Sequence, residues 1–221
     1  MANSKLPEAP CSKIVDWSKW YVFWADQLLV GKNHADRNYK LAKDCLLSSF
    51  PPSKLSSNVP IIPSHVHSIN DSVSAEKAAD EYEFLIRQSV KNRTVKVCDT
   101  GDCPSFDFIL LGLGVDGHVA SLFPNQSAMN EREERVTFTT EFPKSPHERI
   151  TFTLPVINSA SNVAVVATGD SKADAVHLAA DNVGPEFPIV PARMIRPVNG
   201  KLVWLLDEPA ASKLKPSLMS Y

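Results

Sequence analysis

Hydrophobic and polar positions form successive blocks along the chain, and each block predicts one helix or strand. From Ser74 onward, apolar side chains recur at the i, i+3, i+4, i+7 spacing of a single helical face. This spacing predicts a helix that buries Ala75, Ala78, Ala79, Tyr82, Leu85 and Ile86. Shorter patterns predict helices over 38–47 and 171–180, and a further helix that opens near His118.

Runs of apolar and β-branched residues predict the strands. The run from Phe106 to Leu113 is almost entirely apolar and ends in glycines, which is typical of a parallel strand covered on both faces. Trp20 to Trp24 predicts a buried strand that delivers Asp26 at its carboxyl end. Further extended segments are expected at 61–69, within 136–154, at 162–168 and at 202–206.

The alternation of strands and helices predicts an α/β fold, namely a three-layer, mainly parallel Rossmann-like sheet with helices on both faces. A chain of 221 residues buries roughly 70% of its unfolded surface and needs neither disulfides nor a structural metal to fold. Its 17 prolines and 8 glycines leave little material for a flexible linker. We therefore expect one domain over 1–221, with 1–13 and 215–221 as flexible tails.

Composition and charge exclude several functional classes. A net charge of −2 with both signs interspersed gives no electrostatic footprint for nucleic acid or an anionic membrane. No apolar run approaches the roughly 18 residues that cross a bilayer, and no secretory signal is expected. Four scattered cysteines indicate thiols in a reducing compartment. We expect a cytosolic monomer or weak homodimer, since the internal Ser212-Lys213-Leu214 is not a terminal peroxisomal signal.

The segment from Phe108 to Pro124 carries the strongest chemical signal, because three of its glycines permit a tight turn out of a strand. By spacing alone this G-x-G-x-x-G pattern indicates a dinucleotide site, with Glu141 placed to bind a ribose. However, Asp116 and His118 flank the last glycine, and an acid beside a base at a sheet edge favours proton transfer. A histidine that only satisfies backbone groups at a helix start is the alternative.

Three more charged residues are candidates for the same site. The carboxyl ends of parallel strands share one edge, so Asp26 and His118 can converge although they are far apart in sequence; taken alone, such an aspartate is more often a cap. Arg149 and Lys172 place two cations near a helix N-terminus, a pattern that suits a phosphate monoester. Either cation alone would be an ordinary surface charge.

Other motifs carry weaker signals. His65 and His67 lie on one face of an extended segment, but no cluster of acids or cysteines accompanies them, so a metal site is not expected. Cys98 and Cys103 flank a short polar loop and are interpreted as incidental thiols. Cys45 has no histidine nearby that would make it a nucleophile.

Several of these motifs together resemble the 6-phosphogluconolactonases of the glucosamine-6-phosphate isomerase/6-phosphogluconolactonase superfamily. The block from Gly112 to Pro124 is similar to the signature of that family, and three later blocks follow in the family's order: 149–158, 169–173 and 204–207. The segments 16–26 and 38–42 resemble plant-type members in particular. The resemblance covers about residues 14 to 214.

The resemblance implies hydrolysis of 6-phospho-D-glucono-1,5-lactone to 6-phosphogluconate, without a metal or an organic cofactor. It implies that His118 is the general base that activates water, with Asp26 and Asp116 positioning it or the water. The N–H groups near Gly114 and Gly117 would stabilise the oxyanion. Arg149 and Lys172 would hold the 6-phosphate of this sugar-phosphate lactone.

The chain departs from the family pattern at two places. The family's Asp-Glu-Arg stands here as Asp26-Gln27-Leu28, so the expected arginine is replaced by an apolar side chain. The first strand-helix unit of the family, with its Ser-Gly-Gly-Ser phosphate loop, is expected to be missing. These departures predict weakened activity, and they leave open a second hypothesis: a catalytically impaired paralogue or truncated isoform that acts by binding a sugar phosphate or a partner.

Overall fold

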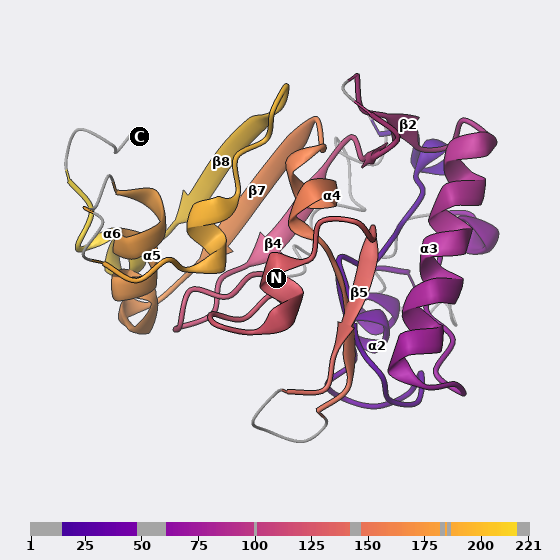
Figure 1. The fold of residues 1–221 in the computed structure, drawn as a ribbon, viewed down its shortest axis with the longest axis horizontal. Coiled ribbons are helices and arrows are strands. Elements are labelled where there is room, and N and C mark those ends of the chain that lie inside the picture. Colours follow the sequence, from indigo (N-terminus) through magenta and orange to yellow (C-terminus); the bar gives the residue numbers. More distant parts are fainter. Residues whose placement is uncertain are drawn as a thin grey trace, which may run out of the picture.

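The computed structural model describes residues 15–47, 61–99, 101–141, 147–181, 184 and 187–215. It confirms the α/β class, with helices packed against parallel and antiparallel strands (Figure 1). The α-helices are α2 (Asn38–Ala42), α3 (Ala75–Lys91), α4 (Leu154–Asn158), α5 (Ala173–Ala180) and α6 (Glu208–Ala211). The strands are β1 (Asp26–Leu28), β2 (Lys96–Val97), β3 (Pro104–Ser105), β4 (Ile109–Gly112), β5 (Val136–Thr139), β6 (Arg149–Phe152), β7 (Asn162–Ala167) and β8 (Lys201–Leu206). Short helical turns are η1 (Trp17–Lys19), η2 (Lys43–Leu47), η3 (Pro63–His65), η4 (Ser127–Asn130), η5 (Asp170–Lys172) and η6 (Pro191–Met194).

A parallel sheet of three strands, in the order β4-β7-β8, forms one half of the structure. Gly112 at the end of β4 pairs with Val166 of β7, so the loops after these two strands leave the sheet at the same edge. Figure 1 shows α5 and α6 grouped beside the carboxyl ends of β7 and β8. At this edge, the glycine turn follows β4 and the Gly169 loop follows β7.

One face of this parallel sheet differs from the expectation that both faces are covered. Ile109 and Leu111 are buried, but Leu110 between them is 59% exposed, and Val203 and Leu205 of β8 are exposed too. Side chains alternate between the two faces of a strand, so a continuous apolar run does not show which face is covered. On the second face, the side chains of β4 and β8 named here are therefore exposed, whereas Ala164 of β7 between them is buried.

An antiparallel sheet in the order β1-β6-β5 forms the other half. Its register pairs Asp26 with Thr151 and Leu28 with Arg149. Helix α3 packs along β5 and β6, as Figure 1 shows on the right of the view. The buried positions of α3 include Ala78 and Tyr82, so the helix and face predicted from the apolar spacing are confirmed.

The segment Trp20 to Trp24 corrects a prediction. It is not a strand of the sheet: only Val22 makes an isolated bridge, to Val66, and Trp20 and Tyr21 are exposed. The strand β1 instead begins at Asp26, which therefore opens an antiparallel strand rather than ending a parallel one. The aromatic run is extended because its rings stack on the neighbouring segment, as Tyr21 does on His65 with centroids 3.9 Å apart.

The segment after the glycine motif corrects a second prediction, because no helix opens at His118. Val119 forms antiparallel bridges with both Leu113 and Leu122, so the chain folds back on itself. Ala120 adopts a φ of 49°, a left-handed conformation that an α-helix cannot contain. A helix N-terminus that could hold a pyrophosphate is therefore absent from this turn, which argues against the dinucleotide interpretation.

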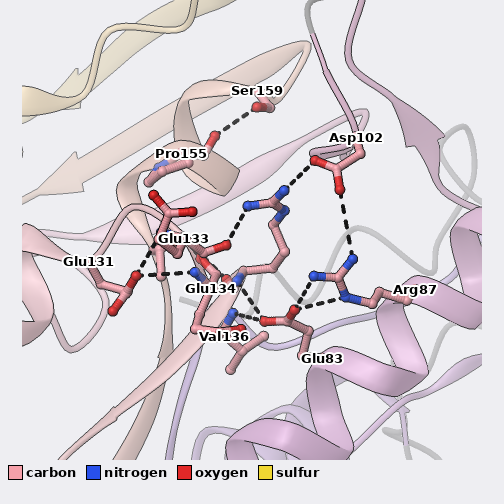
Figure 2. A network of polar contacts seen from close by, with 11 residues as sticks. Glu83, Arg87, Asp102, Glu131, Glu133, Glu134, Val136, Pro155 and Ser159 are labelled. Carbon is pink, nitrogen blue, oxygen red and sulfur yellow. Dashed lines mark hydrogen bonds and ion pairs between the residues drawn. The ribbon is translucent and has the colours of Figure 1, made fainter.

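A polar network joins α3 to the start of β5, and Figure 2 shows it from close by. The Glu83 carboxylate is buried and accepts hydrogen bonds from the backbone N–H groups of Arg135 and Val136, at 2.6 and 2.9 Å. It also accepts one from Arg87 Nε at 2.8 Å. Asp102 forms ion pairs with Arg87 and Arg135 at the far side of the network. Glu83 thus supplies partners that the first backbone groups of β5 need.

We expect Glu83→Ala to lower the free energy of unfolding by about 3 kcal/mol, because it leaves buried N–H groups and the Arg87 guanidinium without their acceptor. Urea denaturation followed by circular dichroism measures this change. Glu76→Ala is the matched control, since Glu76 is an exposed glutamate of the same helix. Equal stability of the two variants would contradict the assignment of Glu83 as the anchor of β5.

Candidate active site

The glycine turn after β4 holds an acid and a base in direct contact. His118 Nδ1 lies 2.6 Å from Asp116 Oδ1, and the His118 backbone N–H donates to the same oxygen at 3.2 Å. The turn itself is closed by the Gly114 N–H, which donates to the His118 carbonyl at 2.9 Å. The backbone therefore fixes the imidazole at the carboxyl edge of the parallel sheet.

The carboxylate of Asp116 sets the tautomer of His118. Partial burial acts to raise the pKa of Asp116, but the hydrogen bonds from the side chain and backbone of His118 outweigh it, and the pKa is lowered. The ionised carboxylate can only accept, so Nδ1 of His118 is the donor, and in the neutral imidazole Nε2 is then the nitrogen that keeps its lone pair. His118 is thus arranged as a base at Nε2, and Asp116 as its partner.

Asp26 lies half-buried near this pair, although it comes from the antiparallel sheet. Its Oδ2 accepts a hydrogen bond from Ser121 Oγ at 2.8 Å, and Asn38 Nδ2 lies 3.3 Å from Oδ1. Burial raises the pKa of Asp26, opposed in turn by the Ser121 hydrogen bond and by the charges of Arg149 and His118. Asp26 and His118 therefore act on each other electrostatically, by a route different from the shared parallel edge that the sequence suggested.

Arg149 supplies the positive charge of this cluster. It begins β6, and its guanidinium carbon lies 5.8 Å from the centre of the Phe123 ring. The ring of His118 lies against the same phenyl ring at 4.4 Å between centroids. Desolvation lowers the pKa of Arg149 while Asp26 raises it, and it remains a cation at neutral pH. Phe123 thus separates the base from the arginine and packs against both.

Lys172 lies on the next loop of the parallel sheet rather than within these contacts. It ends η5, which follows β7, and α5 begins at the next residue. The loop is held by Asp207 at the end of β8, whose two carboxylate oxygens each lie 3.0 Å from the Gly169 N–H. Gly169 has a φ of 88°, so a residue with a side chain would be strained there. The fold places Lys172 at the same edge of the sheet as His118.

Two glycines of the motif stand where a side chain would not fit. A Cβ atom at Gly114 would lie 1.9 Å from His118 Nδ1, and one at Gly117 would lie 2.6 Å from Val190 Cβ. The N–H groups of both glycines already donate within the turn, to His118 and Gly114 respectively. Gly114 thus leaves space for the imidazole of His118 and Gly117 leaves space for Val190, and oxyanion binding by their N–H groups stays a prediction.

The weaker candidates remain outside this cluster. His65 stacks on Tyr21 and His67 on Phe23, and the described residues contain no group of three or more histidine, cysteine or acidic side chains that could hold a metal. Burial raises the pKa of Cys103, which reduces its thiolate fraction. The side chain of Cys45 lies outside the described residues. A cavity of about 420 Å³ between α3 and the β2–β3 hairpin contains none of the site residues.

Sequence reasoning assigned no role to Ser121, Phe123, Asn38 or Thr151. Ser121 and Phe123 stand inside the glycine motif, but a serine and a phenylalanine carry no chemical signal of their own there. Asn38 begins α2 and reaches Asp26, and Thr151 pairs with Asp26 across the sheet. Only the tertiary contacts show that Ser121, Asn38 and Thr151 lie around Asp26 and that Phe123 packs against His118 and Arg149.

Together these features define an α/β protein with a histidine–carboxylate site where two sheets meet. No helix among the described residues is long and apolar enough to cross a membrane. The sequence model described as "Glucosamine-6-phosphate isomerases/6-phosphogluconolactonase" matches residues 2–204. The chain belongs to this family.

Individual relatives agree with that membership. The chain is 59% identical over 212 residues to "Probable 6-phosphogluconolactonase 1" of Arabidopsis thaliana, covering 95% of this chain and 76% of the relative. It is 56% identical over 213 residues to "Probable 6-phosphogluconolactonase 2" of Oryza sativa subsp. indica, covering 95% and 73%. The solved 6-phosphogluconolactonase from Trypanosoma cruzi superposes with a TM-score of 0.76 at 28% identity, covering 96% of this chain and 79% of that one.

Proposed function

We propose that this chain hydrolyses 6-phospho-D-glucono-1,5-lactone to 6-phosphogluconate, the second step of the oxidative pentose phosphate pathway. The names of its relatives from Arabidopsis, rice and Trypanosoma cruzi support this substrate. The observation that carries the proposal is the 2.6 Å contact between Asp116 Oδ1 and His118 Nδ1, because it leaves Nε2 as a base at the edge of the sheet. Lactone hydrolysis needs such a base to activate water.

The proposed reaction proceeds by addition and elimination. His118 Nε2 takes a proton from water while the water oxygen forms a bond to the lactone carbonyl carbon. The carbonyl oxygen becomes an oxyanion, which the backbone N–H groups near Gly114 and Gly117 stabilise in this proposal. When the carbon–oxygen bond of the ring breaks, the ring oxygen takes the proton back from the imidazolium. Asp116 stabilises the imidazolium in between, so no metal or organic cofactor is needed for proton balance.

The other charged residues bind and orient the substrate in this proposal. Asp26 orients the water or the imidazole from the buried side of the cluster. Arg149 and Lys172 hold the 6-phosphate, and they approach it from β6 and from the loop after β7. Holding a remote phosphate fixes the carbonyl carbon relative to His118, which turns binding energy into rate.

We expect Lys172→Met to raise KM by ~10-fold with a much smaller change in kcat, because a phosphate contact is present in both the bound substrate and the transition state. Initial rates over a range of lactone concentrations measure this change. Lys201→Met is the matched control, since Lys201 begins β8 at the opposite edge of the same sheet. A KM equal to that of the parent chain would remove Lys172 from the phosphate site.

A second candidate function is sugar-phosphate binding without catalysis, and Leu28 is the observation that favours it. The structure buries Leu28 in β1, paired with Arg149, at the position where the family pattern has an arginine. The chain therefore has an apolar side chain where the resemblance predicts a second cation near the substrate. Calorimetric binding of 6-phosphogluconate with no rate enhancement would support this candidate.

The deciding experiment measures acid release from freshly generated lactone, since the lactone also opens spontaneously. A rate above the spontaneous one, proportional to protein concentration, supports the lactonase. A folded, monodisperse protein that gives no excess rate would contradict it. We also propose a cytosolic, single-domain protein that is monomeric or weakly dimeric and acts on no nucleic acid; cell fractionation and analytical ultracentrifugation test the location and the assembly.

A further inference from the structure

Ser121 joins the glycine turn to Asp26, the half-buried acid of the other sheet. Its side chain is fully buried, and its Oγ donates to Asp26 Oδ2 at 2.8 Å across 95 positions of sequence. Its backbone N–H donates to Thr151 Oγ1 at 3.2 Å. Since Thr151 is the strand partner of Asp26, Ser121 is bound both to the acid and to the residue opposite it.

The backbone before Ser121 is held in a costly conformation. Ala120 has a φ of 49°, which a residue with a Cβ rarely adopts and which persists only where surrounding contacts determine it. Val119 on one side is bridged to Leu113 and Leu122, and Ser121 on the other side is bound to Asp26. The same backbone conformation therefore fixes the positions of both His118 and the Ser121 hydroxyl.

The surroundings of Asp26 show what this hydroxyl adds. Within the described residues, the charged or titratable side chains that act on Asp26 are Arg149 from β6 and His118 from the glycine turn. The amide of Asn38, at the start of α2, lies 3.3 Å from Oδ1. Ser121 makes the shortest of the hydrogen bonds to this carboxylate and is the one donor that comes from the same turn as His118.

We propose that Ser121 is a positioning residue, which fixes the Asp26 carboxylate relative to His118 and keeps it ionised through the Oγ–Oδ2 hydrogen bond. Its role in turnover rests on the proposed lactonase function, whereas its effect on Asp26 does not. A serine hydroxyl is neutral and small, so it can support a buried anion without adding a second charge that would compete with Arg149. Its contribution therefore reaches the reaction only through Asp26.

The direct test is a ¹³C NMR titration of the Asp26 carboxyl in the parent chain and in Ser121→Ala, without substrate. Burial raises the pKa of Asp26 and the Ser121 hydrogen bond lowers it, so we expect the variant to raise this pKa further, by ~1 pH unit. Ser89→Ala is the matched control, because it also removes a buried hydroxyl, one that donates to the Leu85 carbonyl in α3. An Asp26 pKa that is the same in the parent chain and in Ser121→Ala overturns the proposal.

The second test is the pH profile of turnover. We expect Ser121→Ala to lower kcat by ~10-fold at neutral pH and to move the acidic limb upward by ~1 pH unit. Ser89→Ala should leave the acidic limb of the pH profile unchanged. This control distinguishes a positioning role of Ser121 from a general loss of stability. In an Asp26→Asn background, Ser121→Ala should change kcat less than twofold, since the two residues act as a unit. Equal losses in both backgrounds overturn the proposal.

Two further arrangements keep the tests decisive. If Ser121→Ala does not fold, Ser121→Cys replaces it, because a thiol has similar shape and donates weakly; the Asp26 pKa should then rise by a smaller amount. If the parent chain shows no lactonase activity, the proposed function fails. The NMR titration still measures the effect of the Ser121 hydrogen bond on the pKa of Asp26. A raised pKa with no activity supports the positioning of Asp26, and an unchanged pKa contradicts it.

Discussion

Replacing His118 by alanine is expected to lower kcat/KM for the lactone by ~10³-fold. The variant loses the Nε2 lone pair that accepts the proton from water, and Asp116 does not replace it because a carboxylate is a much weaker base than an imidazole. Acid release from freshly generated lactone, corrected for spontaneous opening, measures the loss. The far-ultraviolet circular dichroism of the variant should match that of the parent chain, since the His118 side chain is partly exposed.

The control for this experiment is another histidine that pairs with an aspartate. His177 Nδ1 lies 2.5 Å from Asp181 Oδ2 in α5, away from the glycine turn. His177→Gln keeps a donor toward Asp181 and should retain at least half of the activity of the parent chain. If His118→Ala retained activity comparable to that of His177→Gln, the assignment of His118 as the base would be wrong, and another group would have to activate the water.

Asp26→Asn is expected to reduce kcat by ~100-fold and, at the same time, to raise the midpoint of thermal unfolding at neutral pH. The loss of activity follows from removing the negative charge that acts on His118 and Arg149. The gain in stability follows from burial, which raises the pKa of Asp26 even though Ser121, Arg149 and His118 oppose it. The ionised Asp26 carboxylate is therefore less stable in the folded state than in the unfolded chain.

The sign of this effect sets its pH dependence. An acid whose folded pKa is raised stabilises the protein in its protonated form, so stability falls as pH rises from the ordinary value of about 4 through the raised folded value. The advantage of Asp26→Asn should thus be absent below pH 4 and reach its full size above the raised pKa. Thermal melts at pH 4 and pH 8 measure it, with Asp107→Asn, an exposed acid paired with Lys96, as control. A lower melting midpoint for Asp26→Asn at pH 8 would contradict the effect.

The individual helices and strands of this chain were more predictable than the pairing of its strands. The spacing from Ser74 to Ile86 shows one apolar face, and α3 has that face buried. The aromatic run before Asp26 has the composition of a strand, but its partners are single rings and one bridge rather than a ladder. Strand pairing depends on residues far away in sequence, so a local pattern shows that a segment is extended without showing which sheet it joins.

The site was predictable where its chemistry is local. Asp116 and His118 are two positions apart, and the glycines around them predict the turn that joins them. Asp26 was predicted to end a parallel strand at the same sheet edge as His118. It instead lies in the antiparallel sheet and reaches the cluster from there. Ser121 and Phe123 could not be found in this way, because their importance comes from contacts with Asp26, His118 and Arg149 that only the folded chain makes.

The pairing of β1 with β6 also ties the chemistry to correct folding. Successive side chains of a strand point to opposite faces, so a slip of one residue in this pairing would turn Asp26 away from the glycine turn. Ser121 would then lose its acceptor, and Arg149 would lose the opposite charge. A misfolded molecule with this slip would therefore lose the contribution of Asp26 to turnover, and a preparation that contains such molecules should have a lower specific activity.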